Sequence, residues 1–93
     1  MKITITYTGQ LAEAAGASTE ELELEPGATL GGLVDELAKN HGAKFASLLR
    51  DDSNRLRSSL LVALDGTQAT GDREALALDE VRELMFMTPI AGG

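Results

Sequence analysis

The spacing of the apolar residues changes along this chain, and that change limits the possible folds more than any other feature. Near the N-terminus, Ile3, Ile5 and Tyr7 alternate with threonines, which is typical of a strand with one buried face. From Leu30 to Ala38 the apolar residues follow a helical spacing instead. A single long helix between pairs of strands predicts an α+β roll, in which one main helix crosses a mixed sheet.

The other expected elements are shorter and are separated by turn-forming residues. We expect a second strand over residues 19–25, a short second helix over 44–50, a buried strand over 60–64 and a last strand over 81–88. Residues 10–16 form a turn or a short helical connection between the first two strands. Together these elements make one domain of 93 residues, which is long enough to bury a core.

The main helix has residues suited to both of its ends. Thr29 is placed to cap the N-terminus, and Gly42 is placed to end the helix in a left-handed turn. The glycines at the helix start resemble a phosphate-binding loop, but Leu33 stands where that loop needs a lysine. We therefore interpret Gly31 and Gly32 as positions of close packing, at some cost in helix stability.

The second strand carries carboxylates on one face. Leu22 and Leu24 alternate there with Glu21, Glu23 and Glu25. Three carboxylates on one face are compatible with a metal or a basic partner. We favour the simpler interpretation, in which charges on an edge strand prevent pairing with other chains.

The last strand has two kinds of apolar residue on its two faces. Leu84 and Phe86 share one face, and Met85 and Met87 share the other. If the first pair faces the helix, the methionines lie on the outer side of the sheet, where they suit an adaptable docking surface. Alternatively, both faces of the sheet are partly covered within the monomer.

Composition excludes several classes of function. The net charge of −7 repels phosphate backbones, so we expect no binding to nucleic acid. The chain has no cysteine and one histidine, so it lacks the residues of a persulfide or a typical zinc site, and we expect no metal. The longest apolar run, residues 60–64, is too short to span a bilayer, and the N-terminus is a strand rather than a signal peptide. We expect a cytoplasmic protein that does not bind membranes.

The sequence ends in Gly92-Gly93. Without Cβ atoms, these two residues and a terminal carboxylate can enter a channel that is too narrow for a side chain. Pro89 stiffens the exit from the last strand because its ring fixes φ. We expect a domain over residues 1–88 and a flexible Gly-Gly tail over 89–93. Fully extended, the six residues 88–93 could reach roughly 20 Å beyond the last strand. The alternative is a tail without function.

Several stretches resemble the ubiquitin-like sulfur carriers, in particular the small subunit of molybdopterin synthase. These stretches are Gly9 to Gly16 after the first strand, the helix start Thr29-Leu30, and the acidic turn, apolar strand and Pro-Ile-Ala-Gly-Gly ending over 79–93. The resemblance implies a β-grasp (ubiquitin-like) fold. It also implies that the chain is a protein cosubstrate, or a non-catalytic small subunit of a sulfurtransferase complex, rather than an enzyme.

By this resemblance, the working group is the terminal carboxylate of Gly93, presented by Gly92. A partner similar to the ubiquitin-activating enzymes would use ATP to convert the carboxylate to an acyl-adenylate. Sulfur from a persulfide donor would then replace AMP and leave a thiocarboxylate. The chain itself would bind no cofactor.

The resemblance also suggests which residues meet a partner. Pro89, Ile90 and Ala91 would guide the tail into the large subunit of molybdopterin synthase or another sulfur acceptor. Met85 and Met87 would lie on the docking face.

Three functions remain open from the sequence. The chain could be a sulfur carrier for molybdopterin, or for cysteine, thiamine or a tRNA base. It could be a covalent modifier of other proteins, since the activation chemistry is the same. It could also be a β-grasp interaction module in which the terminal glycines are incidental. A self-contained enzyme is disfavoured because the sequence shows no pairing of a nucleophile with a base.

Overall fold

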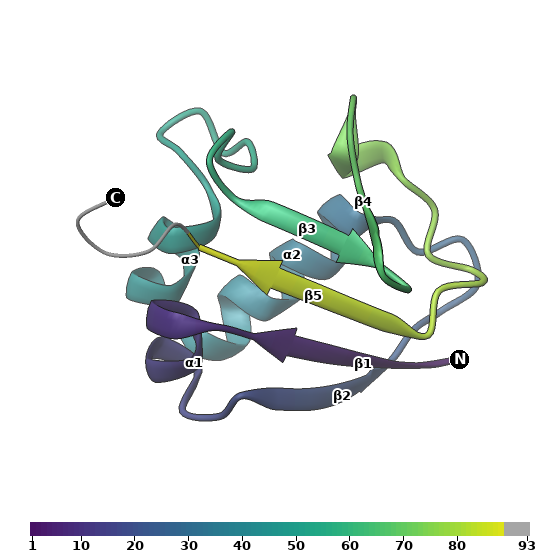
Figure 1. Cartoon of the computed structure of the whole chain (residues 1–93), viewed down its shortest axis with the longest axis horizontal. Helices are drawn as coiled ribbons and strands as arrows, with labels where there is room; N and C mark the ends of the chain where they lie inside the picture. Colours follow the sequence, from purple (N-terminus) through teal and green to yellow (C-terminus); the bar gives the residue numbers. More distant parts are fainter. Residues whose placement is uncertain (89–93) are drawn as a thin grey trace.

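The computed structural model describes residues 1–88 as a five-stranded mixed sheet with helices on one face and at one end (Figure 1). The strands lie in the order β2-β1-β5-β3-β4, with β1 and β5 parallel and the other neighbours antiparallel. Their bounds are Lys2–Tyr7 for β1, Thr19–Glu23 for β2, Leu61–Leu64 for β3, Thr67–Gln68 for β4 and Glu83–Met87 for β5. The predicted α+β roll with a mixed sheet is confirmed.

The main helix, α2 (Leu30–His41), crosses one face of the sheet and buries Leu30, Leu33, Val34 and Leu37. Two shorter helices, α1 (Gly9–Ala15) and α3 (Ala43–Leu49), lie at the end of the sheet where β1 and β5 end (Figure 1). A 3₁₀ turn, η1 (Arg73–Ala75), packs against α2. None of the helices within residues 1–88 has the length and apolar character that crossing a bilayer requires.

The predicted caps of α2 are correct at its start and wrong in detail at its end. The Thr29 Oγ1 atom accepts a hydrogen bond from the Gly32 amide at 3.2 Å. Gly42 ends the helix with φ 92° but with ψ −176°, which is not the left-handed turn that the sequence suggested. Residues with a side chain rarely adopt this positive φ, so glycine suits the junction between α2 and α3, which begins at the next residue, Ala43.

The three aromatic side chains of the protein meet in one cluster beneath the end of the sheet. The ring of Tyr7 lies 5.4 Å from that of Phe45, in an edge-to-face arrangement, and 6.3 Å from that of Phe86, nearly parallel to it. All three residues are almost fully buried. Since β5 ends one residue after Phe86, this cluster anchors the end of the last strand, close to the end of the described residues.

The predicted strand over residues 60–64 is confirmed as β3, but the expectation that the whole strand is buried is wrong. The strand β3 begins at Leu61, whose side chain is 43% exposed, and only Leu60 and Val62 are fully buried. Successive residues of a strand point to opposite faces, and helices cover one face of this sheet, so Leu61 and Ala63 face outward. A continuous apolar run concealed this alternation.

The ends of two other strands differ from prediction. β5 begins at Glu83 rather than Val81, because the Val81 amide donates to the carbonyl of Leu78 in the preceding turn. β2 ends at Glu23 rather than Glu25, opposite the first residue of its partner strand. The short strand β4 and the turn η1 were not predicted. The predicted helical connection and the second helix are confirmed as α1 and α3.

Candidate functional site

The described part of the chain ends just after β5, the central strand of the sheet. β5 lies between β1 and β3 and is hydrogen-bonded to both. Thr88, the last residue described, lies against the start of α1, where a Cβ atom on Gly9 would be 3.5 Å from Thr88 Oγ1. The predicted tail residues lie outside the described residues: Pro89, Ile90, Ala91, Gly92 and Gly93. The origin of the tail is therefore held by two strands and a helix.

An apolar patch lies beside this origin on the outer face of the sheet. We call it the outer patch; it consists of Leu61, Ala63, Met85 and Met87. Leu61 pairs with Met87, and Ala63 pairs with Met85, across the antiparallel strands β3 and β5. Leu61 is 43% exposed, and the other three side chains are half-buried. The predicted outward direction of the methionines is confirmed, while Leu61 was missed because it was assigned to a buried strand.

The rest of the outer face is polar, which gives the outer patch a clear boundary. Next to Met85 the neighbouring strand presents Thr6. Farther from the tail, Thr4 lies between Glu21 on one side and Glu83 on the other. The apolar side chains thus occupy the half of the outer face that is nearer to the tail. The carboxylates of β2 line an edge strand, as predicted.

A polar cluster that the sequence did not predict lies between β2 and the end of α2. The Tyr7 hydroxyl donates a hydrogen bond of 2.7 Å to Glu20 Oε2, and the same oxygen lies 2.6 Å from His41 Nε2. Burial, the hydrogen bond to Glu20 and its negative charge together raise the pKa of Tyr7 far above its usual value. The sequence could have indicated this cluster. Glu20 lies two residues before the half-buried Leu22 in the same strand, so both side chains point to the same face of the sheet, which is the face toward the core.

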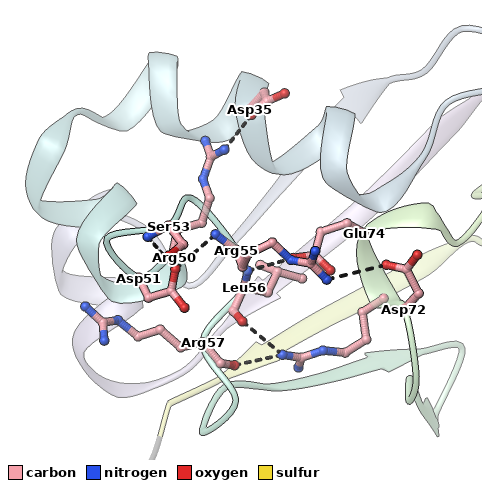
Figure 2. A network of polar contacts seen from close by, with 10 residues as sticks. Asp35, Arg50, Asp51, Ser53, Arg55, Leu56, Arg57, Asp72 and Glu74 are labelled. Carbon is pink, nitrogen blue, oxygen red and sulfur yellow. Dashed lines mark hydrogen bonds and ion pairs between the residues drawn. The ribbon is translucent and has the colours of Figure 1, made fainter.

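A second polar network holds the loop between α3 and β3 (Figure 2). Glu74 accepts hydrogen bonds from the Leu56 amide at 2.8 Å and from Arg55 Nε at 3.1 Å. The bond from the Leu56 amide is the main reason that the pKa of Glu74 is lowered. Arg50 is paired with Asp35 at 2.6 Å. Each of these contacts joins one part of the chain to another, so this network stabilises the loop rather than presenting a reactive group.

Neither polar cluster resembles a metal centre. Among residues 1–88, no group of three or more histidine, aspartate or glutamate side chains is arranged to hold a metal ion. The features that remain as candidates for function are the outer patch and the origin of the tail.

Comparison with known proteins relates this arrangement to a family. The sequence model described as the ThiS family matches residues 5–93. Among solved structures, SAMP1 from Haloferax volcanii is 26% identical, with a TM-score of 0.85 over 100% of both chains. Urm1 from Trypanosoma brucei is 24% identical, with a TM-score of 0.76 over 99% of this chain and 95% of that one.

A protein from Pyrococcus furiosus, described as molybdopterin converting factor, subunit 1, is also similar. It is 23% identical, with a TM-score of 0.67 over 97% of this chain and 99% of that one. These likenesses confirm the predicted ubiquitin-like β-grasp fold. No curated protein sequence matches the chain significantly.

Proposed function

The chain belongs to the ThiS family, and on that premise we propose that it is a sulfur carrier whose working group is the terminal carboxylate of Gly93. The match to the family model carries this proposal, because it runs through the last residue of the sequence, Gly93. The fold agrees with it, because the tail starts from a central, well-anchored strand beside an apolar surface.

A carboxylate must be activated before it can accept sulfur. A partner enzyme would bind ATP, and a Gly93 carboxylate oxygen would attack the α-phosphorus and displace pyrophosphate, giving an acyl-adenylate. The terminal sulfur of a persulfide would then attack the acyl carbon and displace AMP. A thiol of the donor would finally break the S–S bond, releasing the thiocarboxylate and leaving the donor as a disulfide.

In this scheme the chain is a cosubstrate and not an enzyme. The nucleotide, the persulfide and the thiol belong to its partners, so the chain needs no bound cofactor. The absence of cysteine is compatible with this role, because the sulfur is carried on the end of the main chain. Gly92 would let the backbone pass through a narrow channel, and Pro89, Ile90 and Ala91 would guide the tail.

We propose molybdopterin synthesis as the pathway, with the large subunit of molybdopterin synthase as acceptor. The likeness to the Pyrococcus furiosus protein and the resemblance of the sequence to the small subunit motivate this choice. In such a complex, Met85 and Met87 of the outer patch would contact the large subunit while the tail enters its pocket. Donation to cysteine, thiamine or a tRNA base would use the same tail with another acceptor.

A second candidate is a covalent modifier of other proteins. It is favoured by the 26% identity to SAMP1 of Haloferax volcanii, a protein that is named a small archaeal modifier. A modifier passes the activated Gly93 to lysines, so an affinity-tagged chain in its own cells should form a ladder of larger conjugates. A carrier should yield the free, sulfur-loaded chain without such a ladder.

Reconstitution tests the proposal. The chain is incubated with the adenylating enzyme of its host and ATP, and ATP–pyrophosphate exchange is measured. We expect exchange that depends on the chain, and sulfur transfer to a molybdopterin precursor after a persulfide donor and the large subunit are added. Absence of exchange would contradict the carrier and the modifier alike. Exchange with sulfur transfer only to another acceptor would retain the carrier and reject the pathway.

A further inference from the structure

Two hollows on the surface join into one groove that starts at the origin of the tail. The first has a volume of about 330 Å³ and is lined by Thr88, Leu60 and Arg57, among others. The second has a volume of about 410 Å³ and reaches Lys44. Both are lined by Gln10 and by Leu48, so they adjoin between α1 and α3. Figure 1 shows these two helices at the end of the sheet where β5 ends.

The floor of the groove is apolar. Leu48 and Ala14 are half-buried and expose apolar surface in the groove, and the almost fully buried Leu60 lies beneath it. The uncharged polar groups are Gln10 and the serines of α3 and of the following loop, and the carboxylate of Glu13 also lines the second hollow. Such a combination of an apolar floor and a polar rim is typical of a site for a peptide segment rather than for a small ion.

Two cations, Arg57 and Lys44, line the groove together with one carboxylate, Glu13. Arg57 donates from Nε to the Ser47 carbonyl at 2.8 Å, which fixes its side chain at the rim. Neither Arg57 nor Lys44 forms an ion pair with any carboxylate in residues 1–88. The nearby arginines Arg50 and Arg55 differ, because both are paired with carboxylates of the chain. On a chain of net charge −7, two exposed cations that form no ion pair within residues 1–88 outnumber the one carboxylate of this groove, so they are available to an acidic ligand.

We propose that this groove binds an acidic segment of the adenylating partner, with an apolar side chain of that segment on Leu48 and its carboxylates near Arg57 and Lys44. This inference rests on the proposed function. The position of the groove supports it, because a protein that takes the tail into a narrow channel must lie over Thr88, which also lines the groove. The outer patch lies on the sheet and consists of other residues, so the two surfaces are distinct.

Charge reversal tests the groove in the intact chain. The affinity for the host adenylating enzyme is measured by calorimetry for Lys44→Glu, Arg57→Glu and the double variant. Lys39→Glu and Arg82→Glu are the controls, since they make the same charge changes at exposed positions that do not line the groove. We expect the double variant to bind about tenfold more weakly or worse, with a reduced dependence on salt, and the controls to stay within about twofold.

Arg57→Glu also loses the hydrogen bond to Ser47, so a second measurement is independent of that side chain. The chain has no cysteine, so Ser59→Cys can carry a single photo-crosslinker in the groove, and Thr70→Cys can carry it at an exposed position elsewhere. We expect Ser59→Cys alone to crosslink to the enzyme, at a segment rich in aspartate and glutamate. Equal crosslinking from both positions, or a crosslink to a basic segment, would overturn the proposal.

The result also separates this proposal from the proposed function. If the wild-type chain supports no ATP–pyrophosphate exchange, both proposals fall together. If the wild-type chain is activated and the double variant binds and is activated equally well, only the groove is rejected.

Discussion

Leu61 and Met87 pair across β3 and β5 at the C-terminal end of β5, one residue before the last described residue, Thr88. Leu61 has the most exposed large apolar side chain of the sheet, and Met87 is the last residue of β5. The pair therefore places apolar surface directly beside the residue from which the tail begins. A partner that accepts the tail can therefore bury this pair at the same time.

The first prediction concerns this pair. Met87→Asp should weaken the affinity for the sulfur acceptor by about tenfold, because a buried interface would desolvate the new charge. The half-buried side chain contributes little to the core, so the free energy of unfolding should fall by about 1 kcal/mol or less. Thr4→Asp is the matched control, since it adds one negative charge to the same sheet face away from the tail. Equal loss of binding in both variants would show that the outer patch is not the docking surface.

The second prediction uses the single tyrosine of the chain. Folding raises the pKa of Tyr7 through burial and the bond to Glu20, so the unfolded chain releases this proton first. The stabilisation by Tyr7 should be fully present below about pH 10, the usual tyrosine pKa, and should be lost as the pH rises above it.

Ultraviolet absorbance reports tyrosinate from Tyr7 alone. We expect no tyrosinate in the folded protein near pH 10, and its appearance at higher pH together with unfolding. Below this pH, Tyr7→Phe should lower the free energy of unfolding by about 1–2 kcal/mol, because a hydrogen bond to a carboxylate is lost. Ordinary titration of the tyrosine in the folded protein would contradict the observed hydrogen bond.

The third prediction separates two neighbouring glycines. A Cβ atom on Gly31 would lie 3.1 Å from the carbonyl oxygen of Glu74, whereas one on Gly32 would lie 3.5 Å from Thr29 Oγ1. Gly32→Ala should therefore increase the free energy of unfolding by about 0.5–1 kcal/mol through its higher helix propensity. Gly31→Ala should lose this gain or destabilise the fold, because the backbone of η1 must shift. Denaturant unfolding of both variants provides the comparison, and equal stabilisation would refute close packing at Gly31.

Gly31 and Gly32 also show what the sequence can and cannot reveal. The sequence predicted close packing at both glycines, and the structure has it at Gly31 only. A sequence indicates the order of the helices and strands. It does not show which distant segment packs against the start of a given helix. Here that segment is η1, which had no recognisable pattern of its own.

The same limit applies to β3 and to Glu20. The alternation in β1 was readable because threonines separate its apolar residues, and the buried face of Ile3, Ile5 and Tyr7 is confirmed. In β5 the methionines differ in type from Leu84 and Phe86, and the predicted division into two faces is confirmed as well. In β3 every residue is apolar, so the sequence does not show which residues face the core and which face outward, and the exposed Leu61 was missed. Glu20 was in phase with Leu22, but its partners Tyr7 and His41 come from distant segments that only the fold brings together. The tail residues, which carry the proposed chemistry, remain predictions from the sequence.

The fourth prediction concerns the tail. Gly93→Ala, or one residue added after Gly93, should reduce activation by at least about a hundredfold, because the carboxylate would be displaced from its reaction geometry. The midpoint of thermal unfolding should not change, since the change lies beyond the described domain. Measurement of ATP–pyrophosphate exchange with the host enzyme decides this point. Full exchange with the extended chain would mean that the Gly93 carboxylate is not the reacting group.

The most direct test of a sulfur carrier is the intact mass of this protein purified from its own cells. The proposal predicts a fraction of molecules that is heavier by the difference between a sulfur and an oxygen atom, with the change located at Gly93 by fragmentation. A mass that shows only the unmodified carboxylate, even after incubation with ATP, the host adenylating enzyme and a persulfide donor, would contradict it.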